Sequence, residues 1–150
     1  MARAARRESV NARGAARRLL VQALYQWQLG RQPPNELVAQ FSTSPEFARV
    51  DPEYFREAIA AICAEDSRLD EELLLHSDIA PDRLDPVEHS ILQLGLWELM
   101  TRPDVPYRVV INEAVELAKR FGATEGHRYV NAVLDRASKA HRAGERGVVA

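Results

Sequence analysis

Two groups of side chains in this sequence have the chemistry to bind a ligand. Guanidinium groups bind phosphates, and exposed aromatic rings stack on bases, which together is how single-stranded RNA is usually held. Near the end of the chain, His127, Arg128 and Tyr129 place an aromatic ring beside a cation at the expected start of a helix, where backbone N–H groups add an anion site. The other group is the arginines of residues 1–18: Arg3, Arg6, Arg7, Arg13, Arg17 and Arg18.

The charge of the chain is unevenly distributed. Residues 1–18 carry six arginines against Glu8, a net charge of +5, whereas the remainder carries 14 basic and 21 acidic side chains, a net charge of −7. A basic N-terminal arm on an acidic body points to a polyanionic partner bound at one end. The alternative is an arginine-rich leader that is merely solvated, and composition alone does not decide between the two.

Motifs for catalysis, cofactor binding and metal binding are absent from the sequence. The four histidines lie far apart and form no HExxH pair, and Cys63 has no CxxC partner. There is no GxxxxGK, GxGxxG or GxSxG motif. Glu113 and Glu116 have the spacing of an acid–base pair, but on an amphipathic helix with basic residues following they are typical of solvated charges. We therefore expect no enzyme activity, no cofactor and no metal site.

Composition and hydropathy favour a cytoplasmic protein of one domain, or of two lobes that share a core. The chain has 150 residues, of which 46% are hydrophobic and 28% charged, as in ordinary globular domains. Cys63 is the only cysteine, so no intramolecular disulfide is possible. No apolar run reaches the length of a membrane span or resembles a secretory signal. The N-terminal arginines resemble a transit peptide, but those from Arg13 onward are expected to be integral to the first helix.

Residues 104–138 predict two amphipathic helices joined by a tight corner. Apolar residues recur at helical spacing from Val110 to Phe121, and again from Val130 to Ala137. Gly122 is expected to end the first helix with a positive φ angle. Thr124 is expected to cap the second helix, with Glu125 favourably placed near its dipole. Because so short a corner brings the helices together, we expect an αα-hairpin.

The rest of the chain also shows helical periodicity and no strand pattern. Asp51-Pro52 and Asp85-Pro86 each combine a capping side chain with proline at the first helical position. Asp66 interrupts one apolar stripe, which indicates either a helix break there or a residue at the edge of a lobe. The segment from Pro86 to Thr101 is apolar over most of its circumference, which predicts a helix surrounded by others. Helices are expected over residues 9–29, 35–41, 52–76 and 86–101 in addition to the hairpin.

These elements predict an all-α protein of about six or seven helices in two small packed bundles. We expect a single helical domain over residues 9–141, with the division between its two bundles near 77–85. Residues 1–8 offer nothing to bury and are expected to form a flexible basic arm. Residues 142–150 are expected to form a frayed tail.

Three segments of the sequence resemble the NusB family of transcription antitermination factors. The C-terminal one reads VPYRVVINEAVELAKRFGA followed by HRYVNAVLD. The others are LLVQALYQWQLG at 19–30, which resembles the first helix of the family, and VEHSILQLGLWEL at 87–99, which resembles its central helix. The likeness extends from about Asn11 to about Ser138 and is weaker in the middle third.

The resemblance implies a non-enzymatic RNA-binding factor with the all-α NusB fold. Members of the family bind boxA RNA together with NusE, a protein of the small ribosomal subunit. The pair helps RNA polymerase to form an antitermination complex, particularly during ribosomal RNA synthesis. Carried over, the family's RNA-binding positions correspond here to Arg13, Arg17, Tyr25, Glu88, Glu125, Arg128 and Tyr129.

The sequence departs from the family pattern at Gly14-Ala15, where a relative can have consecutive arginines. Arg6, Arg7 and Arg18 are expected to compensate, and whether RNA binds without NusE stays open. Several of these residues also have a structural interpretation. Tyr25 and Tyr129 each adjoin a core position, and His127 is more typical of a hydrogen-bonded corner residue. Trp27 and Trp97 are expected in the core.

Two other functions remain open at the level of sequence. NusB-like domains also precede RNA cytosine methyltransferase domains, so the chain could be an accessory domain of a ribosomal RNA methyltransferase. Alternatively, it could be a helical protein-interaction adaptor whose arginines merely solvate an exposed helix. The location of the NusE surface and the choice between monomer and homodimer do not follow from the sequence.

Overall fold

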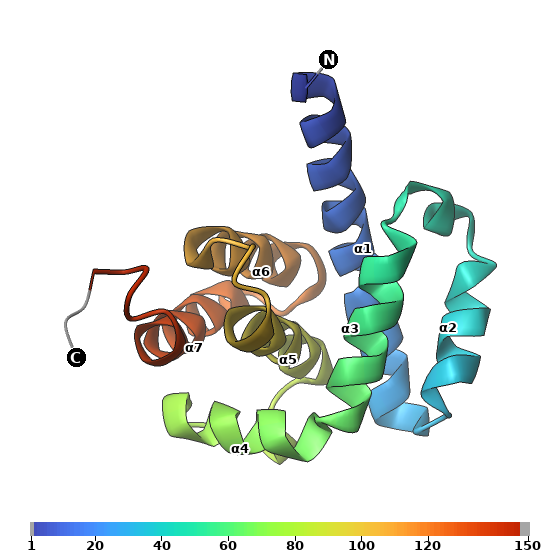
Figure 1. Ribbon diagram of the computed structural model, residues 1–150. Helices are drawn as coiled ribbons and strands as arrows, with labels where there is room; N and C mark the ends of the chain where they lie inside the picture. The colour runs from blue at the N-terminus through green and yellow to red at the C-terminus, as the bar shows by residue number, and fades with distance from the viewer. Residues whose placement is uncertain (1, 148–150) are drawn as a thin grey trace. The chain divides into compact units, whose positions relative to one another are not determined.

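The computed structural model describes residues 2–147, except for the side chains of residues 5–7. Over this range the chain is all-α, with seven α-helices, two short 3₁₀ helices and no strand (Figure 1). This confirms the predicted fold class. The elements are α1 (Ala2–Gly30), α2 (Pro34–Ser42), η1 (Pro45–Arg49), α3 (Pro52–Ala64), α4 (Asp66–His76), η2 (Pro81–Arg83), α5 (Pro86–Thr101), α6 (Tyr107–Phe121) and α7 (Gly126–His141).

The chain divides into two compact units between Ala64 and Glu65. The sequence placed this division near residues 77–85, and that placement is wrong because α4 packs against α5 and α7 in the second unit. Asp66 is the first residue of α4 and accepts a hydrogen bond from Gln93 Nε2 at 2.8 Å. Both interpretations of Asp66 therefore hold, since it lies at a helix break and at the edge of a unit.

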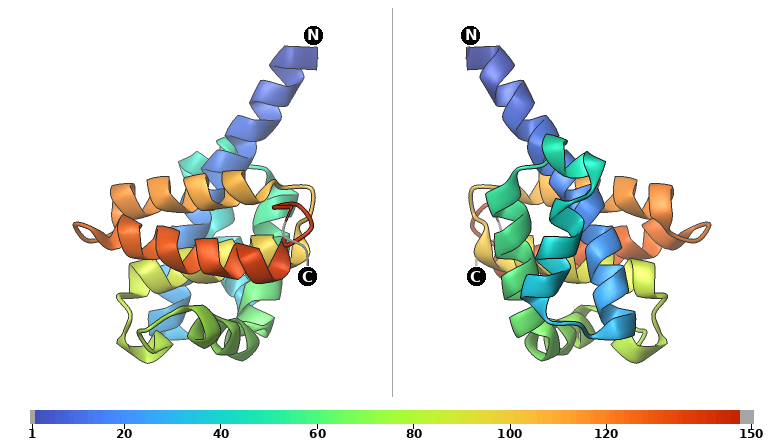
Figure 2. Two further views of the ribbon diagram at one scale, coloured as in Figure 1. Left: turned by 90° about the vertical axis from the view of Figure 1, so that its left-hand side faces the viewer. Right: turned by 90° about the vertical axis from the view of Figure 1, so that its right-hand side faces the viewer.

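The first unit consists of α1, η1, α2 and α3, with α1 and α3 side by side (Figures 1 and 2). As the periodicity predicted, the stripe of α1 from Ala16 to Trp27 is buried, and α3 contributes Phe55 and Ile59. The Phe55 ring meets Phe47 of η1 edge-on, with centroids 5.6 Å apart. Helix α1 begins at Ala2, seven residues before the predicted start. Alanine and arginine are strong helix formers, so the helix continues beyond its buried part.

The second unit is built around α5. Every residue from His89 to Leu99 is buried, and α4, α6 and α7 all pack against this helix (Figure 2). Trp97 is buried here, as Trp27 is in the first unit, so both tryptophans lie in the core as expected. The prediction that the segment from Pro86 to Thr101 is surrounded by other helices is confirmed.

Helices α5 and α7 approach closely at Gly95. A Cβ atom at this position would lie 2.8 Å from Cδ1 and 3.0 Å from Cδ2 of Leu134. Because Leu134 is fully buried, it has little room to move. Gly95 is therefore needed for the packing distance between the two helices.

The corner between α6 and α7 differs from its prediction. Gly122 has φ −89° and ψ −179°, an extended conformation, and the left-handed residue is Glu125 with φ 71°. No side chain caps α7, so the expected capping role of Thr124 is wrong. Gly122 is needed for space, since a Cβ atom there would lie 2.7 Å from the Ala118 carbonyl oxygen. The αα-hairpin itself is confirmed.

The two predicted Asp-Pro helix starts are confirmed. Asp51 Oδ1 accepts a hydrogen bond from the backbone N–H of Tyr54 at 3.1 Å. Asp85 Oδ1 accepts from the backbone N–H groups of Val87 at 2.8 Å and Glu88 at 3.4 Å. Each aspartate therefore satisfies N–H groups that have no partner within the helix.

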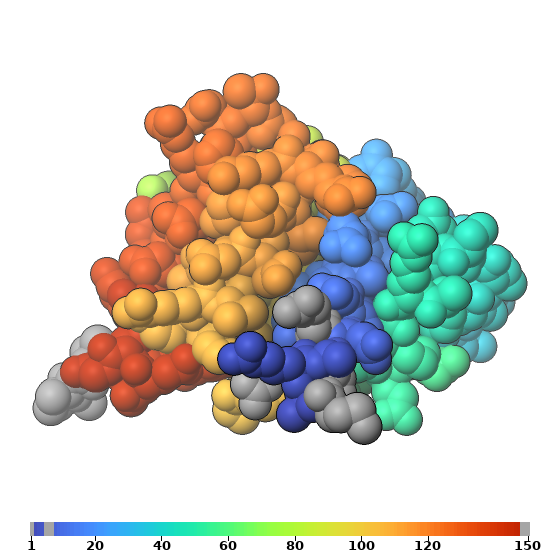
Figure 3. Space-filling model, turned by 90° about the horizontal axis from the view of Figure 1, so that it is seen from above, coloured from blue at the N-terminus to red at the C-terminus, as the bar shows by residue number. Residues whose placement is uncertain are grey.

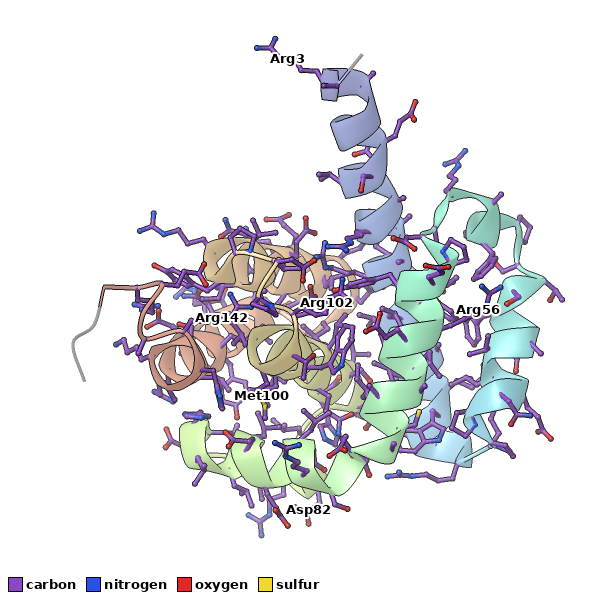
Figure 4. The ribbon with its side chains drawn as sticks, viewed as in Figure 1. Arg3, Arg56, Asp82, Met100, Arg102 and Arg142 are labelled. Atoms are coloured by element: carbon purple, nitrogen blue, oxygen red, sulfur yellow. The ribbon has the colours of Figure 1, made fainter. Side chains whose placement is uncertain are left out.

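The segment after α7 is anchored by Arg142, so the prediction of a frayed tail is wrong for residues 142–147. The Arg142 side chain is buried and reaches from the end of α7 toward α5 (Figure 4). Its guanidinium also pairs with Glu145 at 2.6 Å. It donates hydrogen bonds of 2.8–3.0 Å to four backbone carbonyls, those of Glu98, Leu99, Arg102 and Val105.

Two further contacts hold this segment against α6. Glu145 Oε1 accepts a hydrogen bond from the backbone N–H of Tyr107 at 2.8 Å, and this bond is the main reason that the pKa of Glu145 is lowered. The Arg146 guanidinium lies 4.8 Å from the centroid of the Tyr107 ring. Figure 3 shows the segment beside the beginning of α6. Residues 148–150 lie outside the described part of the chain.

No helix within residues 2–147 combines the length and the apolar character needed to cross a membrane.

We predict that replacement by alanine changes the free energy of unfolding in opposite directions at two helical glycines. Gly95→Ala forces a clash with buried Leu134 and should lower the free energy of unfolding by about 1–3 kcal/mol. Gly14→Ala meets its nearest neighbour at 3.7 Å and should raise it by roughly 0.5–1 kcal/mol through helix propensity. Urea unfolding of both variants measures the two changes. Equal stability of Gly95→Ala and the unaltered protein would contradict the close approach.

We predict that Arg142→Lys destabilises the protein although the charge is kept. An ammonium group does not reproduce the guanidinium fork, so buried carbonyls lose their partners at a cost of roughly 1–3 kcal/mol. Arg120→Lys, at an exposed position on α6, is the matched control and should change stability by less than about 0.5 kcal/mol. Thermal unfolding followed by circular dichroism compares the two. Similar midpoints would show that the Arg142 contacts contribute little.

Candidate nucleic-acid interface

The basic residues of α1 do not all face solvent. Arg13 and Arg17, four residues apart, share one face of the helix, and that face packs against buried Tyr54 of α3. The two guanidinium carbons lie 4.8 Å and 5.8 Å from the centroid of the Tyr54 ring. These are cation–π distances. Both guanidinium groups therefore lie over an aromatic ring.

Burial separates these arginines into different roles. The Arg17 side chain is only 3% exposed, so its expected role as a direct phosphate contact is not supported in this conformation. Arg13 is half-buried, whereas Arg18 is exposed. The Arg18 side chain lies along α1, where a Cβ at Gly14 would come within 3.7 Å of its Nη1 atom. Arg18 is therefore the better placed of the three for an external anion.

The other predicted RNA-binding residues of α1 also differ in how exposed their side chains are. Arg3 is exposed near the start of the helix (Figure 4). The side chains of Arg6 and Arg7 lie outside the described part of the chain. Tyr25 is exposed, at 39% of its surface, so its ring is accessible for the contact with RNA that the family resemblance implies.

In the second unit, Arg128 and Glu125 form an exposed ion pair at the start of α7. The distance from Arg128 Nε to Glu125 Oε2 is 2.6 Å, and the two side chains are 77% and 58% exposed. An exposed pair of this kind contributes little to stability. Arg128 therefore remains accessible to a phosphate, with Glu125 as a neighbour that weakens its positive potential.

Tyr129 is held by a contact within the same unit. The ring is half-buried, and its hydroxyl group hydrogen-bonds Ser77 Oγ. Ser77 in turn donates to the Ile79 carbonyl at 2.7 Å. His127 is half-buried as well. Tyr129 therefore links α7 to the loop after α4, which is the structural alternative to base stacking considered above.

The structure brings Glu88 to the start of α7. A Cβ atom at Gly126 would meet the Glu88 carboxylate, so this carboxylate packs directly against the first residue of α7. Burial is the main cause that raises the pKa of Glu88, and repulsion from Asp85 adds to it. Glu88, Glu125 and Arg128 therefore form one polar group around the first turn of α7, although Glu88 is distant in sequence.

Two residues that organise these surfaces were not predicted from the sequence. Tyr54 supports Arg13 and Arg17. The apolar periodicity of α3 runs through its neighbour Phe55, so it gave no indication of Tyr54. Gly126 makes room for Glu88, yet it resembles an ordinary residue of a turn. Both roles depend on packing between helices, for which a local pattern contains no signal.

The fold and these surfaces define a class: small, two-unit helical proteins with a basic first helix and an exposed arginine at the start of the last helix. Residues 14–139 match the sequence pattern of the NusB family. The chain therefore belongs to the NusB family.

Similar curated proteins carry the name "Transcription antitermination protein NusB". The one from Pseudomonas fluorescens is 48% identical over 133 residues, which cover 89% of this chain and 80% of the relative. The one from Pseudomonas putida, strain GB-1, is 50% identical over 133 residues with the same coverage. The family predicted from three sequence segments is thus confirmed.

Solved structures show the same fold. The chain is similar to "T. maritima NusB, P3121, Form 2", with a TM-score of 0.77 and 28% identity over 91% of this chain and 97% of that chain. It is also similar to a chain of "Crystal Structure of Antitermination Factors NusB and NusE in complex with dsRNA". There the TM-score is 0.71 and the identity 27%, over 86% of this chain and 97% of that one.

We predict that Glu88→Gln flattens the pH dependence of stability in weak acid. Folding raises the pKa of Glu88 above its usual 4.5. The stabilisation that the protonated carboxyl group gives to the folded protein is therefore fully present below that pH, and it is lost as the pH rises through the raised pKa. The neutral amide avoids this loss. The variant should therefore have the higher unfolding midpoint near neutrality, and the difference should vanish in acid.

Thermal unfolding between pH 4 and pH 7 measures this difference. Glu116→Gln, an exposed position on α6, is the control and should leave the profile unchanged. Parallel profiles for Glu88→Gln and the unaltered protein would contradict the effect of burial on this carboxyl group.

Proposed function

We propose that this protein is a non-enzymatic transcription antitermination factor that binds boxA RNA together with NusE. Family membership is the observation that carries the proposal: residues 14–139 match the NusB family, and relatives about half identical to this chain are named as antitermination proteins. In this role the protein acts in the cytoplasm on the RNA polymerase antitermination complex, particularly during ribosomal RNA synthesis. Adaptor and methyltransferase-associated roles are disfavoured, because those relatives carry neither description.

The similar solved complex supports the choice of partners. It contains NusB, NusE and RNA, and 97% of its matched chain aligns with this protein. The RNA there is described as double-stranded, whereas our proposal is single-stranded boxA RNA. Arginines and aromatic rings on exposed helices favour single strands, because unpaired bases offer faces for stacking.

We assign one RNA-contact surface to each unit of the protein. In the first unit, exposed Arg18 supplies charge for phosphate contacts, with half-buried Arg13 beside Tyr54. In the second unit, exposed Arg128 does so at the start of α7. Arg17 is a positioning residue, because it is buried beside Tyr54.

NusE is needed because each surface offers few charges of its own. Gly14 and Ala15 add none to α1, and Glu125 offsets part of the charge of Arg128. Binding of a second protein to the same RNA raises the effective concentration of the strand near these weak contacts. The proposal therefore expects tight RNA binding only by the pair.

We predict salt-sensitive binding of a labelled boxA-like RNA, measured by fluorescence anisotropy with and without NusE. The log–log slope against salt should be about −0.7 for each phosphate neutralised on a single strand. Arg18→Gln and Arg128→Gln should each make the slope less steep by roughly 0.7. Arg17→Gln should instead lower the unfolding midpoint, because it removes a buried cation–π contact.

Arg136→Gln, which removes an exposed arginine further along α7, is the control for net charge and should leave the slope unchanged. A flat salt response would rule out the arginines as main contacts. Tighter binding of a duplex of the same sequence would replace the single-strand proposal. NusE binding without any RNA binding would favour the adaptor.

A further inference from the structure

Two histidines far apart in the sequence meet at a glutamate in the second unit. Glu72 and His76 lie four residues apart on α4 and so share one face of the helix. His141 is the last residue of α7, and Figure 1 shows the ends of the two helices side by side. Glu72 Oε2 lies 3.4 Å from His76 Nε2 and 3.0 Å from His141 Nε2. One possible ligand atom from each of the three residues lies within 4.8 Å of those of the other two.

The spacing of these atoms suits a single transition-metal ion. Zinc binds histidine nitrogen and carboxylate oxygen at about 2.0–2.2 Å, and tetrahedral geometry then separates neighbouring ligand atoms by roughly 3.3–3.6 Å. The two distances from Glu72 come close to this separation. The two imidazole rings, with centroids 6.3 Å apart at an angle of 74°, need only a small movement to complete a set of three ligands.

The contacts within the cluster also favour a cation. His141 Nε2 and Glu72 Oε2 are in hydrogen-bond contact at 3.0 Å, so a ring nitrogen and a carboxylate oxygen already face one another. His76 Nε2 is buried and faces Glu72 Oε2 at 3.4 Å, but within the described residues it makes no hydrogen bond of good geometry. A buried ring nitrogen without a hydrogen bond costs free energy, and a metal ion would use its lone pair.

A cavity beside the cluster leaves room for a fourth ligand. It has a volume of about 220 Å³ and is lined in part by Glu72, His141 and Thr101. Met100, labelled in Figure 4, lies on the side of α5 toward α4 and lines the same cavity. Water in this cavity can therefore reach Glu72 and His141 and supply a further ligand, as in zinc sites with three protein ligands.

We propose that Glu72, His76 and His141 bind one divalent transition-metal ion of the zinc type, with water as the fourth ligand. The ion joins the end of α4 to the end of α7. This junction already includes a hydrogen bond of 2.8 Å from Arg136 Nη1 to the His76 carbonyl. The next residue, Ser77, contacts Tyr129. Metal binding therefore strengthens the attachment of α4 to α7.

The test uses the full chain, freed of metal by a chelator and titrated with zinc chloride alone. Calorimetry should give one site per chain, and saturating zinc should raise the unfolding midpoint. Cobalt chloride should give the visible absorption of a four-coordinate ion. His76→Gln and His141→Gln should each weaken zinc binding by roughly 100-fold or more, because replacing even an outer partner of a metal ligand costs 10–100-fold.

His127→Gln is the matched control, because His127 is half-buried at the other end of α7 and outside the cluster; it should bind zinc like the unaltered protein. Circular dichroism checks that each variant is folded, and Glu72→Gln supplies a third, conservative variant. Zinc binding that survives all three substitutions would overturn the proposal. So would an unfolding midpoint that zinc leaves unchanged, because an ion that joins α4 to α7 must stabilise the folded protein.

Discussion

The second unit depends on the nearly complete burial of α5. A helix that is apolar around its circumference is stable in water only when other helices cover it on all sides, and α4, α6 and α7 do so. Close packing with α7 requires Gly95 opposite Leu134. The carbonyls at the end of α5 then need partners, and Arg142 supplies them. The polar residues His89 and Gln93 of α5 face α4, where they bond Asp70.

The cost of burying a charge explains why arginines have different roles here. Arg142 is buried because four carbonyls and Glu145 satisfy its guanidinium. Arg17 is buried against the ring of Tyr54, an environment that a weakly hydrated guanidinium tolerates. Arg18 and Arg128 remain exposed. Only exposed arginines keep their field available to a phosphate, so we expect RNA contacts at these positions and not at the buried ones.

The sequence predicted the helices well because helical periodicity and capping are local. The apolar stripe of α1, the hairpin and the Asp51 and Asp85 caps all followed from residues within a few positions of one another. Predictions were wrong where packing between residues far apart in the sequence determines the structure. Glu125, and not Gly122, has the positive φ at the corner, Arg142 anchors a segment that looks like a polar tail, and Tyr54 covers Arg17. His76 and His141 have no shared pattern in the sequence, so their meeting at Glu72 emerges only from the fold.

In the proposed complex, RNA contacts the exposed arginines of α1 and α7 while the buried ones hold the fold. Arginine-specific modification with phenylglyoxal, followed by peptide mass spectrometry, tests this arrangement on the protein with NusE, before and after boxA-like RNA is added. RNA should protect Arg18 and Arg128 from modification, whereas Arg142 should be unreactive in both states. Unchanged reactivity of Arg18 and Arg128 in the RNA complex, with protection of arginines elsewhere, would contradict it.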